Sequence, residues 1–255
     1  MEEQKQFEIQ GGSLEKSLSG ETQLDLKAMV KEAWELSKNT KTAVLHGVLL
    51  LFFIAIIFAW VLQSVFGITD LNVVPPSMMI SLKVAGVIVT TPIIATMFLL
   101  GISHSVGIKP RFLSILKNVM GSVLVILLAL LLVAISDVGS FVGSQISVLL
   151  GMAVLIYTNL ATGFSIMLLI EKRLAPSQCV IQSLRVFHKY WMPLSMFYLI
   201  YYCCLFLGAL SLGFAYIWII PFFINMKGIL YRELFGVKVR SVKDKPKQDE
   251  TVFHA

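Results

Sequence analysis

The feature that most constrains this chain is a series of long apolar runs without charged residues, one of which extends from residue 193 to residue 226. Charged residues make up only 14% of the 255 positions, and hydrophobic residues make up 57%. A soluble protein usually carries about 25% charged residues, so a water-facing surface is not expected here. Because about 20 apolar residues in a helix cross the bilayer core, the sequence predicts an all-α, polytopic membrane bundle.

Six predicted transmembrane helices account for these runs. They cover approximately residues 43–68, 84–102, 119–135, 148–170, 193–210 and 213–230. Asp137, Gly139 and Gly143 are expected to break the helix between the third and fourth spans. The last two spans share one uncharged stretch, which as a single helix would be about 50 Å long and would exceed the bilayer core of about 30 Å. We place their break between Gly208 and Gly213; one long, kinked helix would give five spans instead.

The distribution of Lys and Arg predicts the orientation of these spans. Under the six-span assignment, 20 of the 21 Lys and Arg residues lie on one side of the membrane, and only Lys83 lies on the other. Positively charged segments next to spans stay in the cytoplasm, so both termini are expected there. A five-span chain would move the seven cations from Lys227 to Lys247 to the outside. The excess positive charge fits anionic lipid headgroups as partners, and nucleic-acid binding is not needed to explain it.

The two ends of the chain differ in composition from the membrane domain, which we assign to residues 22–236. Residues 1–21 and 237–255 are polar or charge-rich and are predicted to be flexible cytoplasmic tails. The first apolar run begins only near Ala43. A cleavable signal peptide would place its apolar core nearer to the start, so none is expected.

A basic, amphipathic segment precedes the first, third and fifth spans. The landmarks Lys38, Lys117 and Lys189 lie just before these spans and are 79 and 72 residues apart. The spacing suggests three copies of an interfacial helix followed by a helical hairpin, although the alternation of basic loops and spans in any membrane protein explains it as well. Residues expected to contact lipid headgroups are Lys27, Lys31, Trp34, Lys109, Arg111, Arg185, Lys189 and Trp191.

Polar residues and prolines inside the spans are candidates for an intramembrane site. These are Pro92, Thr158, Asn159, Pro221 and Asn225. Such polar groups commonly bond neighbouring helices, and prolines commonly kink them, but the same groups also line the binding sites of transporters. The centres of the predicted spans contain no charged residue, which disfavours ion-coupled pumping.

The sequence predicts no enzymatic activity, cofactor or metal site. It lacks the usual motifs of hydrolysis and phosphoryl transfer. His104 and His188 are expected in basic loops, without carboxylates or cysteines at the spacing of metal ligands. Catalytic, cofactor-binding and metal-binding residues are therefore not assigned.

Several short segments resemble a bacterial family. They are residues 33–34, 183–185, 190–191, 231–232 and 235–236, together with Pro221. In these segments the chain resembles uncharacterised YciC-like inner-membrane proteins, and it is also similar to the membrane domain of some glycerophosphodiester phosphodiesterases. The resemblance implies a bacterial inner-membrane bundle of about six helices, without the phosphodiesterase catalytic domain. It implies no activity and no functional residues.

Two functions are compatible with these observations. The first is a non-catalytic inner-membrane protein that organises or senses lipid or envelope components, with anionic lipids, another protein or a second copy of the chain as partners. The second is a small-solute or lipid transporter with a cavity near Pro92, Asn159 and Pro221.

Overall fold

The computed structural model describes residues 7–68 and 74–240. Two short strands, β1 (Phe7–Gln10) and β2 (Val237–Arg240), accompany a helical bundle. The helices are α1 (Leu14–Ser19), α2 (Leu26–Phe66), α3 (Pro76–Ser105), α4 (Phe112–Met120), α5 (Val123–Ser144), α6 (Val148–Ala161), α7 (Ser165–Lys172), α8 (Pro176–Lys189), α9 (Trp191–Leu210) and α10 (Tyr216–Phe235).

The helices confirm the predicted class, an all-α polytopic membrane bundle. Within the described residues, five segments are long and apolar enough to cross a membrane: α2, α3, α5, the combined stretch Val148–Lys172, and α9. Helix α10 has 20 residues but carries three charged residues, Lys227, Arg232 and Glu233. The charged residues of α2 all precede a long uncharged stretch, whereas those of α10 lie in its second half and leave no such stretch.

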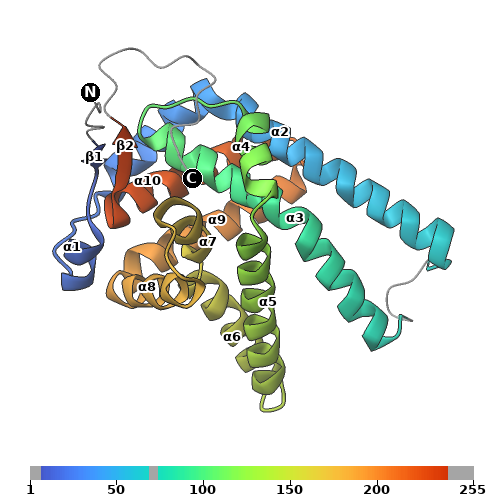
Figure 1. Cartoon of the computed structure of the whole chain (residues 1–255). Coiled ribbons are helices and arrows are strands. Elements are labelled where there is room, and N and C mark those ends of the chain that lie inside the picture. The colour runs from blue at the N-terminus through green and yellow to red at the C-terminus, as the bar shows by residue number, and fades with distance from the viewer. Residues whose placement is uncertain (1–6, 69–73, 241–255) are drawn as a thin grey trace, which may run out of the picture.

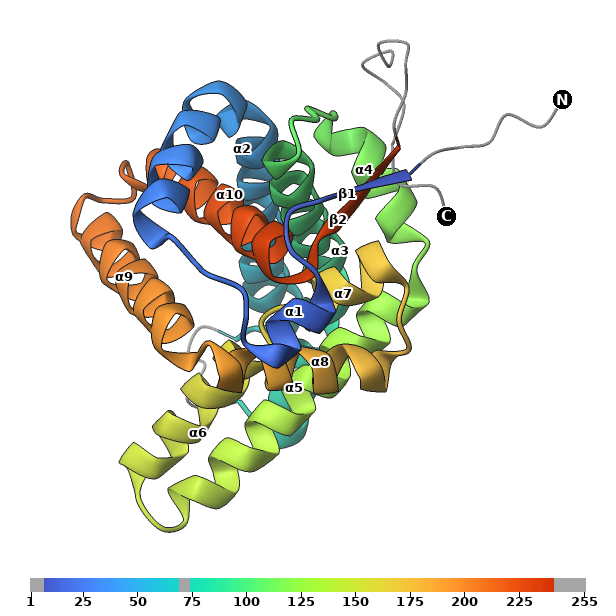
Figure 2. The same ribbon diagram turned by 90° about the vertical axis from the view of Figure 1, so that its left-hand side faces the viewer.

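Three helical hairpins diverge from a common packed end. Figure 1 shows α2–α3 and α5–α6 pointing in different directions, and Figure 2 shows α9–α10 as the third hairpin. We define the packed end as residues 26–47, 91–105 and 221–237, which contain much of the buried core. We define the hairpin tips as residues 60–68, 74–83, 135–152 and 205–214. Most of the large apolar side chains at the tips are exposed, which suits contact with lipid.

Helix α2 joins the first predicted amphipathic segment and the first predicted span in one helix of 41 residues. The Asp25 side chain caps its start by accepting a hydrogen bond from the backbone of Ala28, at 3.0 Å. Neither a proline nor a turn interrupts the helix after this cap. Its length is about 60 Å, twice the thickness of the bilayer core, so only part of α2 fits within the hydrocarbon.

The expected helix break at Asp137, Gly139 and Gly143 is wrong, because α5 continues to Ser144 and the turn follows at residues 145–147. The two glycines instead allow α6 to approach closely. A Cβ atom on Gly143 would lie 3.1 Å from the Cα of Gly151. Small residues commonly have this role where membrane helices pack.

The turn between α9 and α10 occupies residues 211–215. Gly213 has a φ of 87°, a conformation that favours glycine. The apolar stretch is thus divided into two helices rather than continuing as one.

Parts of both predicted tails are folded. Strands β1 and β2 are antiparallel, with Ile9 opposite Lys238 and Gln10 opposite Val237. Val237 is fully buried, and the Ser17 hydroxyl of α1 donates a hydrogen bond to the Leu234 carbonyl. Residues 7–20 and 237–240 are therefore part of the structure, contrary to the prediction. The remaining tail residues, 1–6 and 241–255, lie outside the described residues.

Candidate functional site

Asn225, one of the predicted intramembrane residues, connects three helices in the packed end. Its side-chain amide donates hydrogen bonds to the hydroxyls of Ser37 and Thr40 in α2, at 3.0 and 3.2 Å. Its carbonyl oxygen lies 2.8 Å from Nδ1 of His104. His104 was predicted to lie in a loop but belongs to α3 and is only 2% exposed. These contacts give Asn225 a structural role between α2, α3 and α10.

The other predicted intramembrane residues do not form one site with Asn225. The Ser136 hydroxyl of α5 donates to Thr158 of α6 at 2.9 Å, which joins these two helices. Asn159 lines a cavity, described below. Pro92 and Pro221 are buried within α3 and α10 and do not line that cavity.

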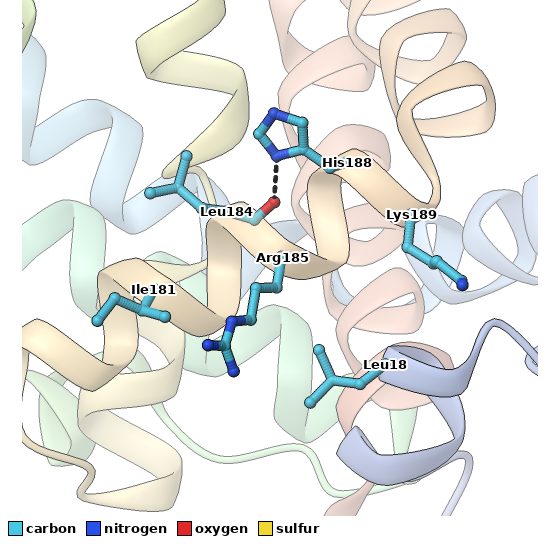
Figure 3. A pocket seen from close by; sticks show the side chains of 6 residues that line it. All are labelled: Leu18, Ile181, Leu184, Arg185, His188 and Lys189. Carbon is cyan, nitrogen blue, oxygen red and sulfur yellow. Dashed lines mark hydrogen bonds between the residues drawn. The ribbon is translucent and has the colours of Figure 1, made fainter.

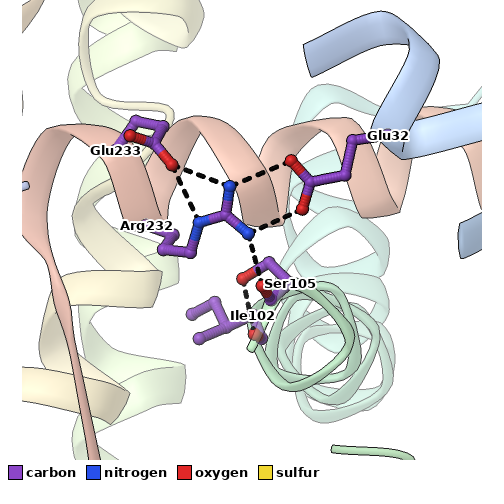
Figure 4. A network of polar contacts seen from close by, with 5 residues as sticks. All are labelled: Glu32, Ile102, Ser105, Arg232 and Glu233. Carbon is purple, nitrogen blue, oxygen red and sulfur yellow. Dashed lines mark hydrogen bonds and ion pairs between the residues drawn. The ribbon is translucent and has the colours of Figure 1, made fainter. Parts of the chain in front are cut away.

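A charged network centred on Arg232 joins the same three helices that Asn225 connects (Figure 4). The guanidinium makes two hydrogen bonds with the Glu32 carboxylate of α2, at 2.6 and 3.0 Å. It also donates to Glu233, at 2.7 and 2.9 Å, and to the Ser105 carbonyl at the end of α3. The sequence analysis placed Arg232 among the cations of the carboxyl end, and its pairing with a residue 200 positions away gave no local signal.

Glu171 ties the end of α7 to α10 and β2. The Tyr231 hydroxyl donates to its carboxylate at 2.9 Å, and the backbone N–H of Lys238 does so at 3.3 Å. The neighbouring Lys172 ammonium donates to the Gly236 carbonyl at 2.6 Å. Since the Glu171 side chain is only 2% exposed, this acid serves the packing of the carboxyl-terminal segment.

A surface groove with a cationic rim lies between α1 and α8 (Figure 3). Its lining consists of Leu18, Ile181, Leu184, Arg185, His188 and Lys189. The opposite face of α8 is buried through Cys179, Ser183, Val186 and Phe187. Figure 3 shows the side chains of Arg185 and Lys189 extending from α8 on either side of Leu18. Helix α8 therefore exposes apolar and cationic groups together.

The other residues predicted to contact headgroups are also exposed. They are Lys27, Lys31 and Trp34 on α2, Lys109 and Arg111 before α4, and Trp191 at the start of α9. The Trp34 ring lies 6.3 Å from the Trp218 ring of α10, and the Lys41 ammonium lies 3.7 Å above the latter. Aromatic and cationic side chains thus gather along the first half of α2.

A cavity of about 440 Å³ lies between α3, α5, α6, α7 and α10. Its polar lining consists of Lys83, Thr90, Thr91, Ser136, Asp137, Asn159, Thr162 and Lys227. The remaining wall is largely apolar. The transporter hypothesis expected a cavity near Asn159, and one is present there. Pro92 does not line it, but the adjacent residue Thr91 does.

Lys227 reaches this cavity from α10 because α3 and α10 are in very close contact beside it. A Cβ atom on Gly228 would lie 2.1 Å from the backbone of Gly101, so only glycine fits at this crossing. The Lys227 ammonium lies 3.8 Å from the centre of the Phe98 ring, in a cation–π contact. The sequence analysis counted Lys227 among the cations of the carboxyl end, although the sixth predicted span, residues 213–230, includes it. Nothing in the local sequence indicated that this lysine reaches a cavity.

The described residues offer no cluster suited to a metal ion. No three His, Cys, Asp or Glu side chains among them gather at a distance suited to a metal ion. Burial raises the pKa of the Cys179 thiol to about 11, so this cysteine is protonated at neutral pH and is a weak nucleophile.

Comparisons with known proteins provide no assignment: no family model, curated protein or solved structure matches the chain. The fold and composition define the class, an integral membrane protein with an all-α bundle.

Proposed function

We propose that this protein is a non-catalytic integral membrane protein that binds anionic lipid at one membrane face and thereby organises or senses lipid or envelope components. The observation that carries this proposal is the groove between α1 and α8, where Arg185 and Lys189 border exposed apolar residues. Helices with this combination of groups lie in the headgroup region of membranes.

The groove is supported by the helices around it, because α8 packs against α1, α6, α7 and α9. Phe187 and Val186 anchor the buried face of α8 in the core. Gly20 ends α1 and has no side chain, which leaves room for the stem of Lys189. A Cβ atom added to Gly20 would lie only 2.3 Å from the Cε of Lys189. Helix α1 thus holds the Lys189 stem in place. A fixed cation loses less conformational entropy on binding than a mobile one.

The pairing of β1 with β2 supports a topology in which both ends of the described chain lie on the same face. Gln10 and Val237 are opposite each other in the two strands, which favours an even number of membrane crossings between them. Counting α10 with the five apolar segments gives six. Together with the 20 cations assigned to one side, this favours cytoplasmic termini. We further propose a bacterial inner membrane, as the YciC-like resemblance implies.

The lipid proposal is tested with the full chain in nanodiscs that contain either phosphatidylcholine alone or a mixture with phosphatidylglycerol. Native mass spectrometry measures how strongly each lipid is retained. Each cation near an anionic surface contributes about 1 kcal/mol, so the double variant Arg185→Gln/Lys189→Gln should lower the preference for phosphatidylglycerol about 30-fold. Lys83→Gln, on the opposite side in the six-span topology, is the matched control. An unchanged preference in the double variant would contradict the proposal.

A second candidate function, transport of a small solute or lipid, is favoured by the cavity that contains Asn159 and Lys227. Its lining reaches the surface at Lys83, whose side chain is 53% exposed. Proteoliposomes with a fluorescent lipid in one leaflet test whether the protein moves lipid between leaflets. Filling the cavity by Ala129→Leu should slow such movement. Equal rates with and without the protein would count against lipid transport.

A further inference from the structure

We propose that the cavity between α3, α5 and α10 is a binding site for one anionic amphiphile, whose carboxylate or phosphate group pairs with Lys227. This site is separate from the groove on α8, and the inference does not depend on binding there. It rests on the position of Lys227, the commitments of the neighbouring charges and the composition of the cavity wall.

The position of Lys227 is fixed by the helix crossing. Gly228 contacts Gly101 directly, and Phe98 lies one turn before Gly101 in α3. The Lys227 ammonium consequently lies above the Phe98 ring, within the cavity lining. One side of the site is therefore set by the close crossing of α3 and α10.

The acids of the cavity lining and of the surrounding helices are committed to other groups. Asp137 in the lining pairs with Lys83. Glu171 accepts from Tyr231, and Glu32 and Glu233 pair with Arg232. Among the described residues, no carboxylate lies within ion-pair distance of Lys227. A charge held away from water without a counterion is unfavourable, and the aromatic contact offsets this only in part. An anionic ligand would supply the missing partner.

The polar groups of the wall leave Lys227 as the main donor available to an anion. Thr90 and Thr162 donate their hydroxyl protons to carbonyls of their own helices, at 2.8 and 2.7 Å. One N–H of Asn159 is likewise used, by the Leu155 carbonyl at 2.7 Å. Lys227 is thus the only cationic donor at this end of the described lining. These groups favour a small head with a single negative charge over a larger, highly charged one.

The rest of the wall suits an apolar tail. Val87, Ile94, Leu132 and Ile166 lie between the Lys227 end and the opposite end, where Lys83 pairs with Asp137. Residues 83 to 98 of α3 cover about 22 Å along the helix. The volume of about 440 Å³ is within the usual range of about 300–1,000 Å³ for small-molecule sites. An amphiphile with its head at Lys227 and its tail directed toward Lys83 would contact both the cationic end and the apolar wall of the cavity.

The binding experiment uses the full chain in phosphatidylcholine nanodiscs and native mass spectrometry. The probes are palmitate, 1-palmitoyl lysophosphatidate, hexadecanol and inorganic phosphate. We expect both anionic amphiphiles to bind wild-type protein at least tenfold more tightly than hexadecanol or phosphate. Lys227→Met, which keeps the length of the side chain but removes its charge, should weaken anionic binding about 10–100-fold. Hexadecanol binding should change less than threefold, and Lys227→Arg should retain the preference for anions.

Control variants make the result independent of folding defects in Lys227→Met. Ala129→Leu narrows the cavity without changing its charge and should weaken both amphiphiles at least fivefold. Arg185→Gln/Lys189→Gln should leave their binding unchanged, which separates this site from the groove on α8. Phosphate binding as tight as that of lysophosphatidate would overturn the assignment of an amphiphile. The proposed site at Lys227 would be overturned if Lys227→Met kept the wild-type preference for anions. It would also be overturned if the wild-type protein bound no amphiphile.

Discussion

The packed end carries many more charged residues than the hairpin tips, and the two regions are stabilised differently. In the packed end, the stretch of α3 from Thr91 to Ser105 is almost continuously buried, and Ile229 and Leu230 of α10 are inaccessible. At the tips, Leu149 is 79% exposed and Leu212 is 89% exposed. Lipid can cover the tips without any partner in the chain, whereas the packed end needs side chains from several helices.

Polar bonds account for much of this difference. Lipid is as apolar as a leucine side chain, so close packing and hydrogen bonds provide the specificity of helix contacts in a membrane. The packed end contains both the Asn225 cluster and the Arg232 network. The described part of the tips has a single ion pair, Lys83 with Asp137, and both of its side chains are substantially exposed. Polar bonds thus join several helices at the packed end, whereas at the tip of the α5–α6 hairpin the close approach of Gly143 and Gly151 holds the two helices together.

The largest expected effect comes from removing the charge that joins α2 to α10. Arg232→Met leaves the carboxylates of Glu32 and Glu233 without their shared partner, and loss of one member of a buried ion pair typically costs about 3–5 kcal/mol. Because Arg232 is partly exposed, we expect the lower end of this range. Denaturant unfolding in mild detergent measures the change. Arg173→Met, at an exposed position, is the control and should change the unfolding free energy by less than about 0.5 kcal/mol.

The next effect tests whether backbone contact defines the packed end. Gly228→Ala places a Cβ atom 2.1 Å from the backbone of Gly101, so α3 and α10 must separate. We expect a loss of about 1–3 kcal/mol, as for other overpacked positions. Gly86→Ala is the matched change near a tip, where nothing lies within 4 Å, and it should be neutral or slightly stabilising. Equal losses in the two variants, measured by thermal unfolding, would remove the distinction between the regions.

The sequence predicted the tips better than the packed end. Long uncharged runs predict membrane helices because the hydrophobic requirement acts on each segment alone, and the turn after Gly208 followed from length. The Arg232–Glu32 pair and the Asn225–His104 contact depend on residues more than 100 positions apart, which no local pattern records. The count of cations also assigned Lys227 to the cytoplasmic carboxyl end, although it lies within α10 and lines a cavity of the bundle. The glycines of α5 were misjudged because the same residue that ends helices also permits their close approach.

The smallest effect concerns the ion pair at the tips. Lys83 and Asp137 join α3 to α5, but their side chains are 53% and 41% exposed. Exposed pairs usually contribute between zero and about 1 kcal/mol, because water and salt screen the charges and two long side chains must be ordered. A double-mutant cycle with Lys83→Met and Asp137→Asn should therefore give a coupling energy below about 1 kcal/mol, and this energy should decrease further as salt is raised. Thermal unfolding in nanodiscs at low and high salt provides both values. A coupling comparable with that of Arg232 and Glu32, and insensitive to salt, would mean that the hairpins are fastened at their tips as firmly as at their bases.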